Sequence, residues 1–219
     1  MRTILFKAAI AGAASVSGLG TIASDSVQAV TFDLACSGLF CGDIDSLFEY
    51  SEEGIDLDVT GFVNSDPSEA RLVNQTVVGL GVFGGNAGSG QVDTGFFNIF
   101  ETLRLEFDHK VKLLSAEFRL VSDIFGEDSA SVSADGTEVF NGPIPSTGGF
   151  FAGFPGEITF TPSADGKVFD FTLTDTNDGY RLYSVEVEKV LVPEPAAMLG
   201  LGTVVAGLLL QKRSRKEIA

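Results

Sequence analysis

The feature that most constrains the fold of this chain is the alternation of apolar and polar residues along its central part. In Leu103 to Phe107 the odd positions are apolar and the even positions are charged, and similar alternation recurs in Val168 to Leu173 and in Tyr183 to Val187. A period of two places one face of a β-strand in a core and the other in water. Since no stretch keeps a helical period, the sequence predicts an all-β domain, arranged as a β-sandwich.

Turn residues divide this region into short strands. Asp135-Gly136 and Asp165-Gly166 each stand between two strand-like runs, where Asp-Gly favours a tight hairpin. A third turn is expected at Phe107 to Val111, and Gly81 to Gly95 is predicted to be a long surface loop. The predicted strands are Ile55 to Val63, Leu72 to Phe83, Glu101 to Phe107, Lys112 to Val121, Ala130 to Ser133, Glu138 to Phe140, Glu157 to Thr161, Lys167 to Thr174 and Tyr180 to Val190.

The amino-terminal segment has the order of a secretory signal peptide. Arg2 and Lys7 precede a run of small, apolar and hydroxyl residues from Ala8 to Ala23, and Val27 to Ala29 fits the small-x-small cleavage rule. We therefore predict that residues 1–29 are removed after Ala29. The alternative is an uncleaved membrane anchor.

The carboxy-terminal segment predicts a single short transmembrane helix. Ala196 to Leu210 carries no charge and is followed by a basic cluster. At about 1.5 Å per residue the helix covers about 22 Å, less than the roughly 30 Å hydrocarbon core, so it can span if the basic side chains snorkel and the bilayer thins locally. The cluster should remain cytoplasmic, leaving residues 30–191 outside as an ectodomain. Its members are Lys212, Arg213, Arg215 and Lys216.

Val192, Pro193, Glu194 and Pro195 stand directly before this helix and cannot continue a strand or helix. The Pro-Glu-Pro triplet, the short apolar helix and the basic end together resemble the PEP-CTERM sorting signal of bacterial surface proteins. The resemblance covers residues 192–219. It implies an exosortase as partner, cleavage near the motif, and association with extracellular polysaccharide and biofilm. The alternative is an ordinary tail anchor with a proline-rich stalk.

The predicted ectodomain is strongly acidic. Of the chain's 30 acidic residues all but Asp25, Glu194 and Glu217 lie in it, whereas six of the 14 basic residues lie outside it. Such a field repels nucleic acid and attracts cations, so a nucleic-acid-binding role is excluded. The only two cysteines, Cys36 and Cys41, are expected to pair in an oxidising compartment.

Two acidic groups are candidates for calcium, which prefers several oxygen ligands. Asp and Asn at such positions also form simple turns, so both interpretations stay open, and no other cofactor is predicted. The candidate ligands are Asp123, Glu127 and Asp128 in the first group and Asp175, Asn177 and Asp178 in the second.

No catalytic residue is predicted. A triad-type hydrolase needs a histidine, and the only one, His109, lies in a predicted turn without a nucleophile motif nearby. A glycosidase needs only two carboxylates, but nothing singles out a pair. Three phenylalanines in the glycine-framed segment Gly148 to Gly156 either cover the end of the sandwich or form an exposed contact surface.

These observations predict an exported, surface-sorted, non-catalytic structural or adhesive component of the extracellular matrix. The order of its elements also resembles the jelly-roll bodies found ahead of PEP-CTERM tails, and galactose-binding-like modules. A calcium-assisted carbohydrate-binding module is the alternative function, and an uncharacterised secreted hydrolase is the third.

If the sorting signal is processed, the surface form should lack Leu199 to Ala219, because the helix is short and the Pro-Glu-Pro stalk is accessible to a cleaving enzyme. Mass spectrometry of the carboxy-terminal peptide from envelope protein checks this. Recovery of an intact tail from Lys212 to Ala219 in most molecules would contradict processing.

Overall fold

The computed structural model of the chain describes residues 28–38, 41–64, 66–83, 90–95, 99–121, 128–146, 155–174 and 179–190. Every regular element in these ranges is a β-strand, so the prediction of an all-β domain is confirmed. No helix in these ranges is long and apolar enough to cross a membrane. The predicted signal peptide up to Val27 and the sorting segment from Val192 lie outside the described residues.

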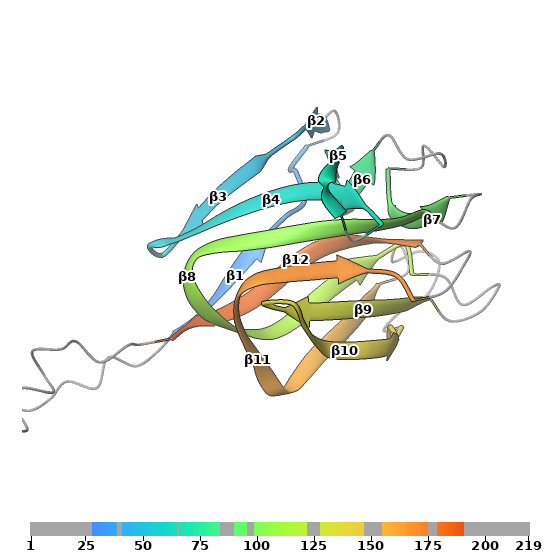
Figure 1. Ribbon diagram of the computed structural model, residues 1–219. Helices are drawn as coiled ribbons and strands as arrows, with labels where there is room; N and C mark the ends of the chain where they lie inside the picture. Colours follow the sequence, from blue (N-terminus) through green and yellow to red (C-terminus); the bar gives the residue numbers. More distant parts are fainter. Residues whose placement is uncertain are drawn as a thin grey trace, which may run out of the picture.

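The described part of the chain contains twelve strands (Figure 1). They are β1 (Ala29–Asp33), β2 (Asp43–Asp45), β3 (Phe48–Glu52), β4 (Ile55–Val63), β5 (Asp66–Thr76), β6 (Gly79–Phe83), β7 (Val92–Gly95), β8 (Ile99–Arg119), β9 (Ser129–Ala134), β10 (Thr137–Pro143), β11 (Gly156–Thr172) and β12 (Gly179–Lys189).

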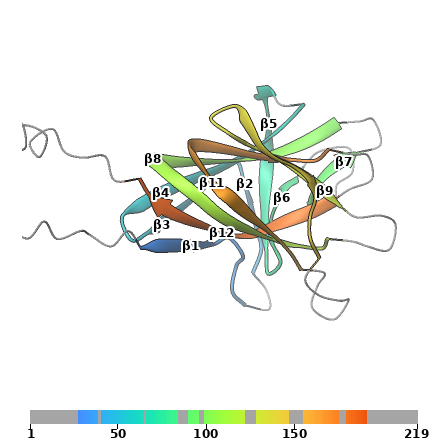
Figure 2. The same ribbon diagram turned by 90° about the horizontal axis from the view of Figure 1, so that it is seen from below.

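The strands form two layers that share β8 and β11. One layer has the order β3, β4, first half of β8, second half of β11, β9, β10, and all its pairs are antiparallel. The other has the order first half of β11, second half of β8, β12, β1. Strands β5 and β6 connect the layers at one side, because β5 pairs with β4 and β6 reaches β12. Figures 1 and 2 show β8 and β11 curving as they run through the molecule.

The core lies between these layers and is mainly aromatic and β-branched. Phe107 on β8 makes edge-to-face contacts with Phe32 on β1 and Phe169 on β11, at ring-centroid distances of 5.7 and 5.9 Å. Phe118, further along β8, meets Tyr180 of β12 edge to face at 5.0 Å. All of these rings are fully buried. The odd positions of Leu103 to Phe107 face this core, as the alternation predicts.

Two of the predicted turns are wrong. Residues 107–111 continue as strand within β8, and residues 164–166 continue within β11. The register between the two strands shifts at Thr159/Ala164 and at Gly166/Val168, so β-bulges bend them where hairpins were expected. Gly166 serves close packing rather than a turn, since a Cβ there would lie 3.1 Å from the Phe169 ring and 3.2 Å from Ala134 Cβ.

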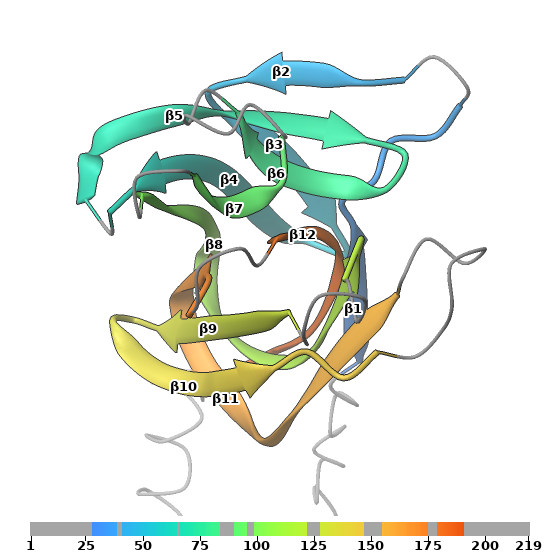
Figure 3. The ribbon, with the colours of Figure 1, turned by 90° about the vertical axis from the view of Figure 1, so that its right-hand side faces the viewer.

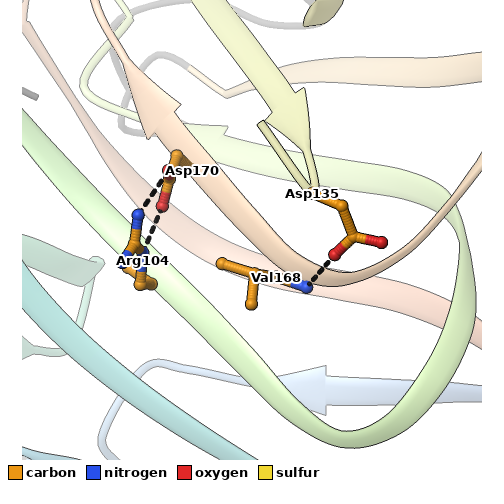
Figure 4. Close-up of polar contacts among 4 residues, drawn as sticks. All are labelled: Arg104, Asp135, Val168 and Asp170. Atoms are coloured by element: carbon orange, nitrogen blue, oxygen red, sulfur yellow. Dashed lines mark hydrogen bonds and ion pairs between the residues drawn. The ribbon is translucent and has the colours of Figure 1, made fainter. Parts of the chain in front are cut away.

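The hairpin predicted at Asp135-Gly136 is confirmed. It joins β9 to β10, and both residues have positive φ, 48° and 78°, as a type I′ turn requires. Asp135 also holds the bend of β11, because its Oδ1 accepts hydrogen bonds from the amides of Lys167 and Val168 at 2.9 and 3.0 Å. Figure 4 shows the contact with Val168. These backbone donors keep the pKa of Asp135 below its ordinary value.

Three further differences from the sequence prediction concern the amino-terminal half. Strands β1, β2 and β3 were not predicted, and the run from Leu72 to Phe83 divides into β5 and β6 at a turn over Val77 and Val78. The segment Gly81 to Gly95, predicted as one loop, contains the end of β6 and the short strand β7. Strands such as β2 and β3 are short and mostly exposed, so they contain too few apolar residues to show a clear alternation of apolar and polar positions.

Cys36 and Cys41 are joined by a disulfide in the structure, with their Cα atoms 5.8 Å apart. The amide of Cys36 donates to the carbonyl of Thr76 at 3.1 Å, which ties this small loop to the end of β5.

Candidate functional site

An open depression of about 510 Å³ lies on the outer face of the layer that contains β4, β8, β11, β9 and β10. We call it the outer-face pocket. It lies where β4 and β11 end and β8 and β9 begin. These strand ends are at the right of Figure 1 and face the viewer in Figure 3. Its lining residues are Asn64, Phe100, Ser131, Asn141, Thr172, Leu173 and Thr174.

Strand register explains how distant residues meet in this pocket. Thr172 on β11 stands opposite Thr102 on β8 and Ser131 on β9, and Ser131 stands opposite Asn141 on β10. Directly opposed residues share a face of the sheet, so these side chains form one row across four strands. Phe100 is two positions before Thr102 on β8 and therefore lies on the same outer face.

Thr172 is held in the row through both its side chain and its backbone. Its hydroxyl donates to the carbonyl of Glu101 at 3.0 Å, and its own carbonyl accepts from the Tyr180 hydroxyl at 3.1 Å. Since Tyr180 is fully buried, this hydrogen bond connects the Thr172 backbone, at the pocket, to the core.

Two positions away from Thr102 and Thr172 along the same two strands, Arg104 of β8 and Asp170 of β11 form a bidentate ion pair. Nε and Nη2 of Arg104 lie 2.7 and 2.8 Å from the two carboxylate oxygens of Asp170 (Figure 4). The guanidinium also lies 4.8 Å from the centre of the Phe62 ring. Each of these two charges therefore has its counter-ion in direct contact.

A pair of buried acids lies on the inner side of the layer, next to Thr102 of β8. Glu101 is 2 % exposed and Asp93 is 9 % exposed, and the amide of Asp93 donates to Oε2 of Glu101 at 3.1 Å. Burial, and after it the negative charge of Asp93, raise the pKa of Glu101 to about 8, although the positive charge of Arg71 acts in the opposite direction. Glu101 is therefore mainly protonated at neutral pH.

Only one of the six predicted calcium ligands, Asp128, belongs to the described residues. It is buried, and its Oδ1 accepts a hydrogen bond from the amide of Gly179 at 3.3 Å, so the last residue of the first acidic group contacts the residue that follows Asp178 of the second. In the described ranges no group of three or more His, Cys, Asp or Glu side chains could hold a metal ion. Asp123, Glu127, Asp175, Asn177 and Asp178 lie outside those ranges.

His109 lies far from the pocket. Its Nδ1 is 2.6 Å from Oδ1 of the adjacent Asp108, and it is nine positions from Phe100, on the order of 30 Å along β8. The turn predicted around His109 is absent, because this residue lies within β8. The three phenylalanines between Gly148 and Gly156 lie outside the described residues.

Sequence reasoning missed every lining residue of the outer-face pocket. Their common signal is weak: the outward positions near these strand ends carry Ser, Thr and Asn, whereas those further along β8 carry Arg104 and Glu106. No single strand shows this signal, because the row exists only after four strands pair.

Comparisons with known proteins leave the family of this chain open. No family model matches it, and no curated protein matches it. Among solved structures, CpGH89CBM32-6 produced by Clostridium perfringens aligns with a TM-score of 0.33 and 12 % identity, covering 60 % of this chain and 94 % of that one. CpGH89CBM32-5 from the same organism, in complex with GalNAc-beta-1,3-galactose, aligns with a TM-score of 0.29 and 14 % identity, covering 60 % and 95 %. Scores this low establish neither family nor function.

The buried acid pair predicts how stability depends on pH. The ordinary pKa of Glu101 is 4.5, whereas in the folded chain it is about 8, so between these values the unfolded state loses its proton first. Stability should therefore fall as pH rises through this window, by up to about 1.4 kcal/mol per pH unit. Glu101→Gln, which resembles the protonated acid, should flatten that slope in denaturant titrations of the free energy of unfolding.

Glu106→Gln is the matched control, since Glu106 is exposed on the outer face of the same strand. It should keep the slope of the unmodified chain. A Glu101→Gln variant that also keeps this slope would refute the assignment of the titration to Glu101.

Proposed function

We propose that this chain is an exported, non-catalytic protein that binds extracellular polysaccharide through the outer-face pocket. The observation that carries the proposal is the composition of the lining: amide and hydroxyl side chains from β9, β10, β11 and the residues after β4 and β11 line one pocket with the aromatic ring of Phe100. A sugar ring offers hydroxyl groups at its edge and an apolar C–H face, and such a lining complements both.

The lining also favours binding over catalysis. Asparagine, serine and threonine side chains do not ionise near neutral pH, whereas acid–base hydrolysis needs groups that gain and lose a proton there. The buried pair of Glu101 and Asp93 faces the inside of the layer, away from a ligand in the pocket. The hydrolase alternative is therefore the weaker one.

The predicted sorting signal is compatible with this role. Ala29 on β1 stands opposite Glu188 on β12, so the two ends of the folded part are neighbours at the end of the molecule away from the pocket (Figure 1). An attachment at Val192 to Pro195 would thus direct the pocket away from the envelope. In this proposal an exosortase reads the PEP-CTERM signal, and polysaccharide binding makes the protein an adhesive component of the matrix.

Calcium remains a prediction of the sequence. The contact between Asp128 and Gly179 supports it only by bringing the end of the first acidic segment to the residue that follows Asp178 of the second. In this proposal calcium would act beside the pocket, since Thr174 lies directly before the second acidic segment.

Loss of either the ring or an amide from the lining should weaken binding. Phe100→Ala removes the apolar platform and should cost about tenfold in Kd for a bound polysaccharide, and Asn141→Ala, at an exposed position, should cost several-fold through one lost hydrogen bond. Affinity electrophoresis against a panel of bacterial polysaccharides, followed by calorimetry on those that bind, measures both changes.

Leu72→Ala is the control, because Leu72 is an exposed apolar residue of β5 outside the pocket. It should leave Kd unchanged. Since Phe100 also packs against the core, the melting temperature of each variant must be followed. A panel in which no polysaccharide binds, or binding that survives both pocket substitutions, would defeat the proposal.

A further inference from the structure

Two asparagines of the outer-face pocket have their amide orientation fixed by neighbouring glutamates. Nδ2 of Asn141 donates to Oε2 of Glu138 at 2.9 Å, and Nδ2 of Asn64 donates to Oε2 of Glu69 at 3.3 Å. An ionised carboxylate only accepts hydrogen bonds, so the amide nitrogen must face it. Both amide carbonyl oxygens are therefore left as acceptors, together with one N–H of each amide.

The hydroxyls of the lining already use their donor hydrogens. Ser131 donates to Glu138 at 3.3 Å, Thr172 donates to the carbonyl of Glu101, and Thr174 donates to the hydroxyl of Ser129 at 2.5 Å. A hydroxyl has one hydrogen and two lone pairs, so each of these groups presents lone pairs to a ligand. The described lining is thus richer in acceptors than in donors.

The charges around the pocket also favour a ligand that donates hydrogen bonds and carries a positive charge. Glu138 on β10 and Glu69 on β5 each border the lining through the hydrogen bonds above, while the guanidinium of Arg104 already has Asp170 as its partner. The chain as a whole carries a formal net charge of −16. The ring of Phe100 adds a π face to which a cation is attracted.

We infer that the outer-face pocket selects sugars that carry a free, protonated amino group, as in de-N-acetylated hexosamine polymers. This inference rests on the proposed function. An ammonium group has three donor hydrogens and a positive charge, which match a lining of lone pairs beside Glu138. N-acetylation leaves one donor, adds an acceptor and removes the charge, and a uronic acid brings a carboxylate that the acidic surface repels.

The test compares three oligosaccharides of equal length by calorimetry with the full chain: a glucosamine oligomer, its N-acetylated form and a glucuronic acid oligomer. The glucosamine oligomer should bind at least tenfold more tightly than the N-acetylated one, with the uronate weakest. Equal affinity for the first two would overturn this inference and leave polysaccharide binding intact. Absence of binding to all three, and to the wider polysaccharide panel, would overturn both.

Two variants separate the pocket from the general field of the protein. Glu138→Gln keeps an acceptor for Asn141 and Ser131 but removes the charge, and should reduce the preference for the amino sugar several-fold while changing binding of the N-acetylated oligomer less than twofold. Glu52→Gln makes the same charge change at an exposed position on β3, beside the start of β4 and away from Asn64 at its end. It should change neither. Equal effects of the two substitutions would contradict a preference set by the pocket.

Discussion

The pairing of β8 with β11 is the constraint on which the rest of this structure depends. Each strand belongs to both layers, and each pairs with different neighbours in its two halves. The bend between the halves lets Phe107 and Phe118, from one strand, pack against opposite parts of the core. Since that bend is a pair of bulges rather than a turn, Asp135 and the closely packed Gly166 hold it in place.

This arrangement also shows how far the sequence could predict the fold. Alternation around Leu103 to Phe107 correctly predicts strands and their buried face. The dipeptides Asp135-Gly136 and Asp165-Gly166 have the same local chemistry, yet one forms a hairpin and the other lies within a strand. The difference comes from tertiary contacts. Residues 164–166 pair with the neighbouring strand β8, and Asp135 holds the bend that directly follows them. No local pattern distinguishes the two.

The outer-face pocket follows from the same pairing. At the level of Glu101 and Thr102, β8 carries a buried acid toward the inside and a polar row toward the outside. Phe100, Thr172, Ser131 and Asn141 come from four strands and become neighbours only through register, so a linear sequence could not identify them as a site. The sequence did indicate that the electrostatic field of the protein is negative. The structure adds that one of the carboxylates, Glu138, orients the amide of Asn141 through a hydrogen bond.

The central claim is that a polysaccharide binds at this row of strands. Backbone amide chemical shifts of the isotope-labelled chain, recorded during titration with a polysaccharide oligomer, test it most directly. The account predicts shifts concentrated at Asn64, Phe100, Ser131, Asn141, Thr172 and Thr174, with the amides of β1 and of the second half of β8 unchanged. Saturable shifts centred on β1, β12 or the disulfide loop, with the pocket unchanged, would contradict it.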